Sequence, residues 1–173
     1  MRLNLGCGSD IRDGWVNIDS RYTEGKKPDL IIDLNEGKLP FDDNSVSYVL
    51  ASHVLEHLLN WENIVHEIYR ILKPLGILEI RVPKGLTPGA YHMRTFDIWT
   101  MDWFIDHQLI KNVVSFEPRK LFLLIKRKIN RKFPFYWHIR YYLNISVPEF
   151  CFLGFGKEIV WILQKPIGVG KGG

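Results

Sequence analysis

The sequence predicts an α/β fold with a doubly wound, mostly parallel sheet. Two observations carry this prediction: short apolar segments recur through the first half of the chain, and a glycine turn directly follows the first of them. A helix that joins two parallel strands gives the unit from which such sheets are built. With 173 residues, of which 46% are hydrophobic, the chain suffices for one core. We expect one domain over residues 1–166 and a disordered, glycine-rich tail at 167–173.

Seven apolar segments are expected to form strands. They lie at residues 2–6, 15–19, 29–34, 46–52, 76–83, 111–116 and 157–165. The last one fits an antiparallel strand at the edge of the sheet. The connection SDIRDG between the first two is too short for a crossover helix, so the first helix is expected to be trimmed to about one turn.

One crossover helix is expected between Glu62 and Lys73. Its apolar residues fall on one helical stripe, namely Ile64, Val65, Ile68, Ile71 and Leu72. The Lys73-Pro74 pair ends the pattern, because proline cannot continue a helix. The helix would join the strand at 46–52 to the strand at 76–83, as in a βαβ unit.

An aromatic and basic insertion is expected over about residues 86–148, with helical character. Its segment 118–148 contains eight Lys or Arg residues and no acid, although the chain as a whole carries a net charge of only +4. A basic helix with an apolar face can lie on an anionic membrane, bind a nucleic-acid backbone, or pack with its charges in water. The bulky aliphatic residues of 119–143 favour contact with a membrane surface or a lipid-linked substrate over nucleic acid.

The cellular compartment expected from the sequence is the cytoplasm. Cys7 and Cys151 are the only cysteines, and they lack the C-x-x-C spacing of thiolate zinc sites. No signal peptide and no apolar stretch of transmembrane length is present. Peripheral contact with a membrane through the basic segment is compatible with this location.

The glycine turn LNLGCGSDIRDGWVNID, residues 3–19, is the first candidate site. In parallel α/β sheets, ligands bind at the carboxyl ends of the strands, where Gly6 and Gly8 would let a bound group approach the backbone. The dinucleotide fingerprint requires a third glycine, but Ile11 stands in its place, and Asp19 comes earlier than the acid of that fingerprint. A pyrophosphate would therefore find little to bind, and a purely structural turn remains open.

The order of five segments resembles that of class I S-adenosylmethionine-dependent methyltransferases, of the small kind described only as predicted methyltransferases. The segments are LNLGCGSD, VNID, DLNEGKLPFDDNSVSYVLASHVLEHL, EIYRILKPLGILEIRVP and EIVWILQKP. The resemblance implies a sheet of about seven strands with the last one antiparallel. It also implies S-adenosylmethionine as cofactor and S-adenosylhomocysteine as product. This cofactor lacks a pyrophosphate, which accounts for the missing third glycine.

The resemblance also assigns roles to residues. Gly6, Cys7 and Gly8 would line the methionyl part, and Asp19 would accept hydrogen bonds from the ribose. The other implied cofactor contacts are Asn4 in the same stretch, Asp33 and Leu34 beside the adenine, and Ser52 and His53 at the reacting end. Leu75 departs from the family pattern, because it stands where a second glycine of LKPGG is common.

The segment HVLEH, His53 to His57, is the second candidate site. As a string it matches the inverted zinc-protease motif, but its position directly after a strand argues against that function. Binding of a divalent metal by His53, Glu56 and His57 is a further alternative, although no metal is our expectation. Either histidine could serve as general base with Glu56 as orienting partner, or the segment could simply brace the loop. His92 is another candidate base, with Tyr91 and Arg94 near the acceptor.

The function expected from the sequence is methyl transfer from S-adenosylmethionine to a small-molecule, glycan or lipid-linked acceptor, more readily at oxygen than at nitrogen. Two alternatives stay open. One is a protein of this fold that binds a cofactor or partner without catalysis, and the other is a nucleic-acid methyltransferase that uses the basic segment 119–140. A homodimer is compatible with the sequence, since a second subunit could close the pocket.

Overall fold

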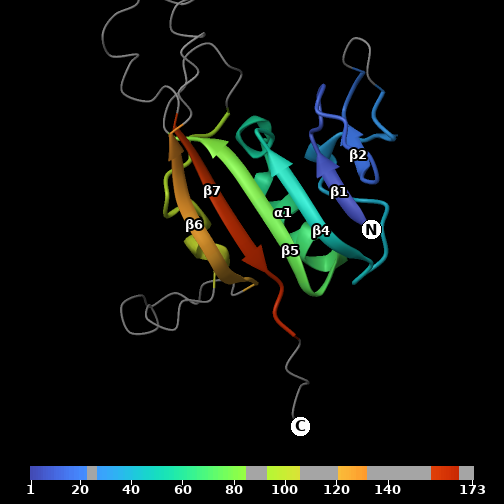
Figure 1. Ribbon diagram of the computed structural model, residues 1–173. Coiled ribbons are helices and arrows are strands. Elements are labelled where there is room, and N and C mark those ends of the chain that lie inside the picture. The colour runs from blue at the N-terminus through green and yellow to red at the C-terminus, as the bar shows by residue number, and fades with distance from the viewer. Residues whose placement is uncertain (23–26, 85–92, 106–120, 132–156, 168–173) are drawn as a thin grey trace, which may run out of the picture.

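The computed structural model describes residues 1–22, 27–84, 93–105, 121–131 and 157–167, which form a seven-stranded sheet (Figure 1). The strand order is β3-β2-β1-β4-β5-β7-β6. The strands are β1 (Arg2–Leu5), β2 (Val16–Asp19), β3 (Leu30–Ile31), β4 (Val46–Ser52), β5 (Leu72–Pro83), β6 (Leu123–Arg131) and β7 (Lys157–Gln164). The helices are the 3-10 turns η1 (Leu34–Glu36), η2 (Leu55–His57) and η3 (Thr100–Phe104), and the α-helix α1 (Trp61–Ile71).

The direction of the strands confirms a mostly parallel sheet. Neighbours from β3 to β5 are parallel, whereas β7 runs antiparallel to both β5 and β6. The expectation that β7 lies at the edge of the sheet was wrong. It lies between β5 and β6, because β6 pairs with it from Leu123, opposite Gln164, to Arg131, opposite Lys157.

The connection between β1 and β2 contains no helix, so the trimming expected from the sequence is complete. Its turn is closed by backbone hydrogen bonds instead, including one from the Cys7 amide to the Ile18 carbonyl of 3.0 Å. The third strand is also shorter than expected, because the chain turns into η1 after Ile31, with Asp33 as the residue that caps it. The glycine turn is therefore joined to β2 by a hydrogen-bonded loop without a helix.

The helix α1 packs its apolar stripe on one face of the sheet (Figure 1). Its buried residues are Trp61, Ile64, Val65, Ile68 and Ile71, and those of β5 on the same face are Leu78, Ile80 and Val82. The helix ends where β5 begins, and Lys165 completes its last turn. The buried Lys165 Nζ donates to the carbonyls of Tyr69 at 2.8 Å and Leu72 at 2.7 Å, which otherwise lack intrahelical donors.

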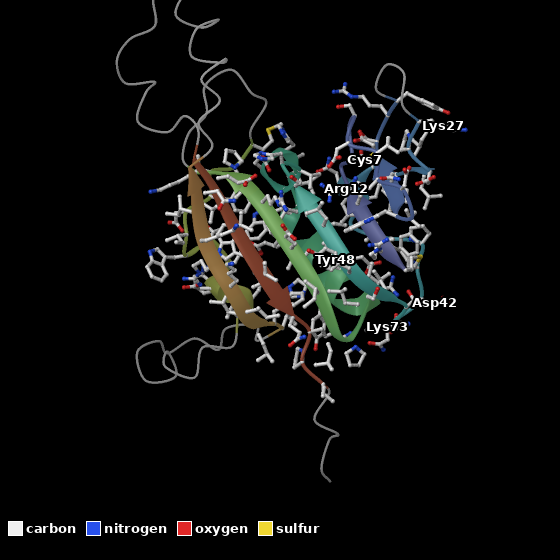
Figure 2. The ribbon with its side chains drawn as sticks, in the orientation of Figure 1. Cys7, Arg12, Lys27, Asp42, Tyr48 and Lys73 are labelled. Atoms are coloured by element: carbon white, nitrogen blue, oxygen red, sulfur yellow. The ribbon has the colours of Figure 1, made fainter. Side chains whose placement is uncertain are left out.

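The opposite face of β4 and β5 carries a polar cluster at its centre. The Tyr48 hydroxyl, labelled in Figure 2, bonds the Glu79 carboxylate, and Arg81 Nε donates to the same carboxylate at 2.7 Å. Burial, together with Glu79, raises the pKa of Tyr48 above its usual range. In the described part of the chain no α-helix covers this face, and these long side chains shield the buried Leu50 beneath them.

The expected basic helix was wrong over residues 123–131, which form β6. The stretch LLIKRKINR offers apolar residues at spacings that suit either a helix or a strand, and pairing with β7 decides for the strand. Residues 119–120 and 132–143 of that segment, the expected strand at 111–116, and Tyr91 lie outside the described residues.

None of the helices in the described ranges is long and apolar enough to cross a membrane.

Candidate functional site

The glycine turn lies at the carboxyl end of β1, next to the end of β2 (Figure 1). In Figure 2, Cys7 is seen at this end of the strands, whereas Asp42 and Lys73 are at the opposite end. Asn4 is buried beneath the turn, where its Nδ2 donates to the Asp10 carbonyl at 2.6 Å and to Asn17 Oδ1 at 3.2 Å. Asn4 therefore shapes the turn from below.

Glycine is needed at the two positions of the turn for different structural reasons. Both adopt positive φ, 59° at Gly6 and 49° at Gly8. A Cβ atom on Gly6 would lie 2.5 Å from Val54 Cγ2, so Gly6 permits the HVLEH segment to pack against the turn. A Cβ atom on Gly8 would meet nothing within 4 Å. Gly8 therefore faces open space, into which a ligand can approach the backbone.

Asp19 at the end of β2 is joined to this open side of the turn. Its Oδ2 accepts a hydrogen bond from the Gly8 amide at 2.7 Å, and its Oδ1 is 3.4 Å from the Arg21 amide. An ionised carboxylate offers about four acceptor positions, so two amides do not exhaust it. The carboxylate is thus fixed beside Gly8 with capacity for further donors such as hydroxyl groups.

Cys7 is a buried, uncharged side chain within the turn. Burial, reinforced by the nearby Asp19, raises the pKa of the Cys7 thiol to about 11. The thiol therefore stays protonated at neutral pH and behaves as a small hydrophobic side chain. Because only 4% of its surface is exposed, the side chain packs within the turn and is unsuited to nucleophilic chemistry.

Asp33, Leu34 and Ser52 complete the residues expected around a cofactor. Asp33 caps η1 by accepting from the Asn35 amide at 2.9 Å, and Leu34 is buried behind it. Asn35 Oδ1 accepts from the Leu59 amide at 2.9 Å, which ties η1 to the chain just after η2. Ser52 is the last residue of β4.

His53 directly follows β4 and has the left-handed φ of 54°. Its amide donates to the Arg81 carbonyl at 2.8 Å, and its Nε2 lies 3.0 Å from Glu158 Oε1. Its Nδ1 lies 3.4 Å from Glu56 Oε1. Positive φ in a residue other than glycine is strained, and such strain persists where surrounding contacts fix the residue, often at functional sites. The contacts to three different elements supply that restraint here.

The carboxylates beside His53 are both buried, with Glu56 only 1% and Glu158 only 2% exposed. Glu158 Oε2 also accepts from Asn130 Nδ2 at 3.1 Å, whereas in the described structure neither Glu56 carboxylate oxygen has a hydrogen bond. A neutral imidazole has one N–H and can donate to one carboxylate, while an imidazolium can donate to both. Each ring nitrogen of His53 thus faces a carboxylate rather than an acceptor molecule.

Glu158 is the site residue that sequence reasoning missed. It lies on β7, 105 residues after His53, and reaches it because β7 inserts beside β5. The only signal for Glu158 in the nearby sequence is that it precedes the continuous apolar run IVWIL. An acid that flanks an apolar run gives no reason to expect burial.

The other two candidate bases, His57 and His92, differ from His53 in their positions. His57 ends η2 and is exposed. His92 lies outside the described residues, so its expected role stays a prediction. Within the described ranges, no group of three or more His, Cys, Asp or Glu side chains is placed to hold a metal ion.

Comparison with known proteins identifies the family. The model of a methyltransferase domain family matches residues 5–80, the span that contains the glycine turn, Asp19 and the HVLEH segment. Residues 5–80 belong to a class I methyltransferase domain. This confirms the family and the fold class that the sequence indicated.

Individual relatives are distant. A mitochondrial 2-methoxy-6-polyprenyl-1,4-benzoquinol methylase from Dictyostelium discoideum is 29% identical over 100 residues, which cover 51% of this chain but only 32% of that protein. A SAM dependent methyltransferase from Archaeoglobus fulgidus matches with a TM-score of 0.55 at 16% identity, over 95% of this chain and 85% of its own. The 1,6-didemethyltoxoflavin-N1-methyltransferase of Burkholderia thailandensis, solved with S-adenosylhomocysteine, matches with a TM-score of 0.56 at 13% identity, over 96% of this chain and 71% of its own.

Proposed function

We propose that this protein transfers a methyl group from S-adenosylmethionine to a small-molecule acceptor that is glycan-like or lipid-linked, at an oxygen atom. The observation that carries the proposal is the pairing of Gly8 with Asp19. Gly8 leaves open space above its backbone, and Asp19 is fixed beside that space by the Gly8 amide at 2.7 Å. A carboxylate next to an open glycine turn suits a nucleoside ribose that arrives without a phosphate.

The residues present fit the cofactor in their chemistry. Gly8 offers room for backbone contact, and Asp19 offers acceptors for two hydroxyl groups, while the uncharged Cys7 packs within the turn between them. Asp33, Leu34 and Ser52 would extend the contact toward the adenine and the reacting end, while Asn4 and Gly6 act indirectly by shaping the turn. When bound, S-adenosylmethionine supplies a methyl group on a sulfonium, and the attacked C–S bond breaks with its electron pair going to sulfur.

The chain's own task is then to align the acceptor and take its proton. Transfer to a hydroxyl oxygen releases one proton, and a histidine is suited to accept it near neutral pH. Because both nitrogens of His53 face carboxylates, we assign His53 a positioning role, with Glu158 and Glu56 fixing its ring. His57, exposed four residues later on η2, is the preferred base, with His92 as the other candidate.

The class of acceptor has the weaker support. The relative from Dictyostelium acts, by its name, on a polyprenyl benzoquinol, which is a ring with two hydroxyl groups and a lipid tail. The match to that protein covers about a third of its length. An acceptor with a lipid-linked portion is compatible with the apolar and basic character of the segment at 119–143.

Calorimetric titration with S-adenosylmethionine and S-adenosylhomocysteine tests the cofactor part. We expect Asp19→Asn to weaken binding about ten- to hundredfold, because hydrogen bonds to a charged group contribute roughly 1.5–3 kcal/mol. Asp13→Asn is the matched control, since it removes the same charge from an exposed position in the same connection. Absence of binding by the wild type, or equal affinity of both variants, would reject the proposed site.

Turnover measurements then separate the roles of the two histidines. His57→Asn should lower kcat with cofactor affinity retained, and His53→Asn should lower both thermal stability and kcat. If cofactor binds but no acceptor is methylated across phenolic, glycan and lipid-linked panels, the protein is a binding protein of this fold. A preference for nucleic acid would appear as acceptor binding that falls steeply with salt.

A further inference from the structure

The connection between Gly8 and β2 is held in place by two buried asparagines, Asn4 and Asn17. They lie directly opposite each other in the pairing of β1 with β2, so their side chains are on the same face of the sheet. Only 2% of Asn4 and 3% of Asn17 are exposed. Because buried amides are satisfied by hydrogen bonds, the partners of these two side chains determine where the connection runs.

Both asparagines bond the backbone of the connection. Asn4 Nδ2 donates to the Asp10 carbonyl at 2.6 Å and to Asn17 Oδ1 at 3.2 Å. Asn17 Oδ1 also accepts from the Arg12 amide at 2.9 Å, and Asn17 Nδ2 donates to the Arg12 carbonyl at 3.1 Å. In a helical connection such backbone groups would pair with one another, whereas here side chains supply the partners. The shape of the connection therefore depends on the orientation of the Asn17 amide group.

Asp29, which directly precedes β3, fixes that orientation. Its Oδ2 accepts from Asn17 Nδ2 at 2.9 Å and from the Asn17 backbone amide at 2.7 Å, and its own amide donates to the Asn17 carbonyl at 2.8 Å. The hydrogen bonds from Asn17 lower the pKa of Asp29, so its carboxylate is ionised at neutral pH. An ionised carboxylate only accepts hydrogen bonds, and the NH₂ group of Asn17 must therefore face it.

The same face of β2 presents Asp19 to the glycine turn. Asp19 follows Asn17 by two residues in the strand, so the alternation of side chains places both on one face. Asp19 bonds the Gly8 amide, and Asn17 bonds the backbone of Arg12 four residues later. The stretch 8–12 is thus bonded to β2 at both of its ends.

We propose that Asn17 and Asp29 are positioning residues for the cofactor, because they hold the stretch 8–12 in its binding shape before the cofactor arrives. This inference rests on the proposed function, since it takes the glycine turn as the cofactor site. A binding loop that is already ordered loses less conformational entropy when a ligand binds. Cofactor affinity therefore depends on these two residues, although neither is assigned a contact with the cofactor.

Amide hydrogen exchange of the ligand-free protein tests the positioning directly. Asp29→Ala removes the acceptor that orients the Asn17 amide group, and it leaves no buried cavity because Asp29 is exposed. We expect exchange at the Gly8 and Arg12 amides to become about tenfold faster. Asp29→Asn should restore most of the protection, because its side-chain oxygen can still accept. Unchanged exchange at both amides in Asp29→Ala would overturn the proposal.

Calorimetric titration with S-adenosylhomocysteine connects the positioning to affinity. Asp29→Ala should weaken binding about tenfold, while the Gly8 amide shift of the bound state should match that of the wild type, because the ligand restores the ordered shape. Asp13→Ala is the charge-matched control, since Asp13 is exposed in the same connection. Asn44→Ala is the stability control, since it removes the 2.8 Å contact with Lys165 at the opposite end of the strands. Both controls should keep the wild-type affinity.

Failure of this inference and failure of the proposed function give different results. A wild-type protein that does not bind S-adenosylhomocysteine would reject the proposed function and this inference with it. Binding by the wild type with unchanged affinity in Asp29→Ala would overturn only the positioning role. An equal loss of affinity in Asp13→Ala or Asn44→Ala would overturn it as well, because the loss would then follow from charge or from general stability.

Discussion

The turn after β1 and the turn after β4 lie side by side but are supported in different ways. The glycine turn is fixed by residues close in sequence: Asn4 bonds Asp10, and Asp19 bonds Gly8. The turn at His53 is fixed by residues far away, with the Arg81 carbonyl on β5 and Glu158 on β7. A local turn can evolve or fold with its own strand pair, whereas the second turn is complete only when the last strand is in place.

Gly6→Ala should lower the stability of the fold more than any other change considered, because Gly6 is where the two turns meet. The added Cβ would overlap Val54 Cγ2 at 2.5 Å and would adopt a strained positive φ. Overpacking and strain together should lower the free energy of unfolding by about 3 kcal/mol. Denaturant unfolding measures this loss.

Val54→Ala in the same chain provides the control for Gly6→Ala. The double variant should recover only part of the loss, because it removes the overlap with Val54 Cγ2 but keeps the close approach to the Cβ of residue 54, 2.6 Å away, and the backbone strain. Gly8→Ala, which meets no atom, should cost only about 1 kcal/mol from its backbone conformation. Equal costs at the two glycines would contradict the different reasons assigned to them.

Glu158→Gln should be the next largest effect and tests the long-range support of the second turn. It removes the buried charge that faces His53 Nε2, which we expect to cost about 2 kcal/mol of unfolding free energy. A double-mutant cycle with His53→Asn measures the coupling between the two side chains. Additive losses would mean that β7 does not support the turn through this contact.

Glu67→Gln should have a smaller effect that depends on pH. Glu67 accepts hydrogen bonds from Arg70 and from the Leu39 amide, and the contact with Arg70 lowers the pKa of Glu67 below its ordinary value of 4.5. A carboxyl with a lowered folded-state pKa stabilises the fold above the unfolded value and loses this contribution as pH falls through the folded value. We expect a difference of about 1 kcal/mol from the wild type at pH 7, shrinking below pH 4.5.

Thermal unfolding of the wild type and Glu67→Gln between neutral and acidic pH checks this sign. Glu62→Gln is the matched control, since Glu62 is exposed at the start of α1. A difference between wild type and Glu67→Gln that grows as pH falls would contradict the assigned direction of the pKa shift.

Leu75→Gly should produce the smallest change, and in the opposite direction. Leu75 has a positive φ of 65° at an exposed turn between α1 and the body of β5, at the edge of the sheet opposite the site. Relief of left-handed strain outweighs the added flexibility of glycine in the unfolded chain, so we expect a gain of about 0.5 kcal/mol. A loss of stability would show that the Leu75 side chain contributes more than its exposure indicates.

The sequence predicted the parts of the site whose contacts are local. Asp19 follows the glycine turn by a fixed short spacing, and the βαβ unit around α1 has a periodicity that only a helix satisfies, so both could be expected. The partnership of His53 with Glu158 could not, because it depends on β7 entering between β5 and β6 rather than closing the edge. For β6 itself, the spacing of apolar residues was ambiguous, and only the hydrogen bonds to β7 distinguish strand from helix.

Titration of the isotope-labelled protein with S-adenosylhomocysteine, followed by backbone amide NMR, tests the central claim most directly. The account predicts that the largest shift changes fall on Gly8 and Asp19, with smaller changes at Ser52 and His53 and none along β6. Shift changes confined to β6, or binding that leaves Gly8 and Asp19 unperturbed, would contradict the assignment of the glycine turn as the cofactor site.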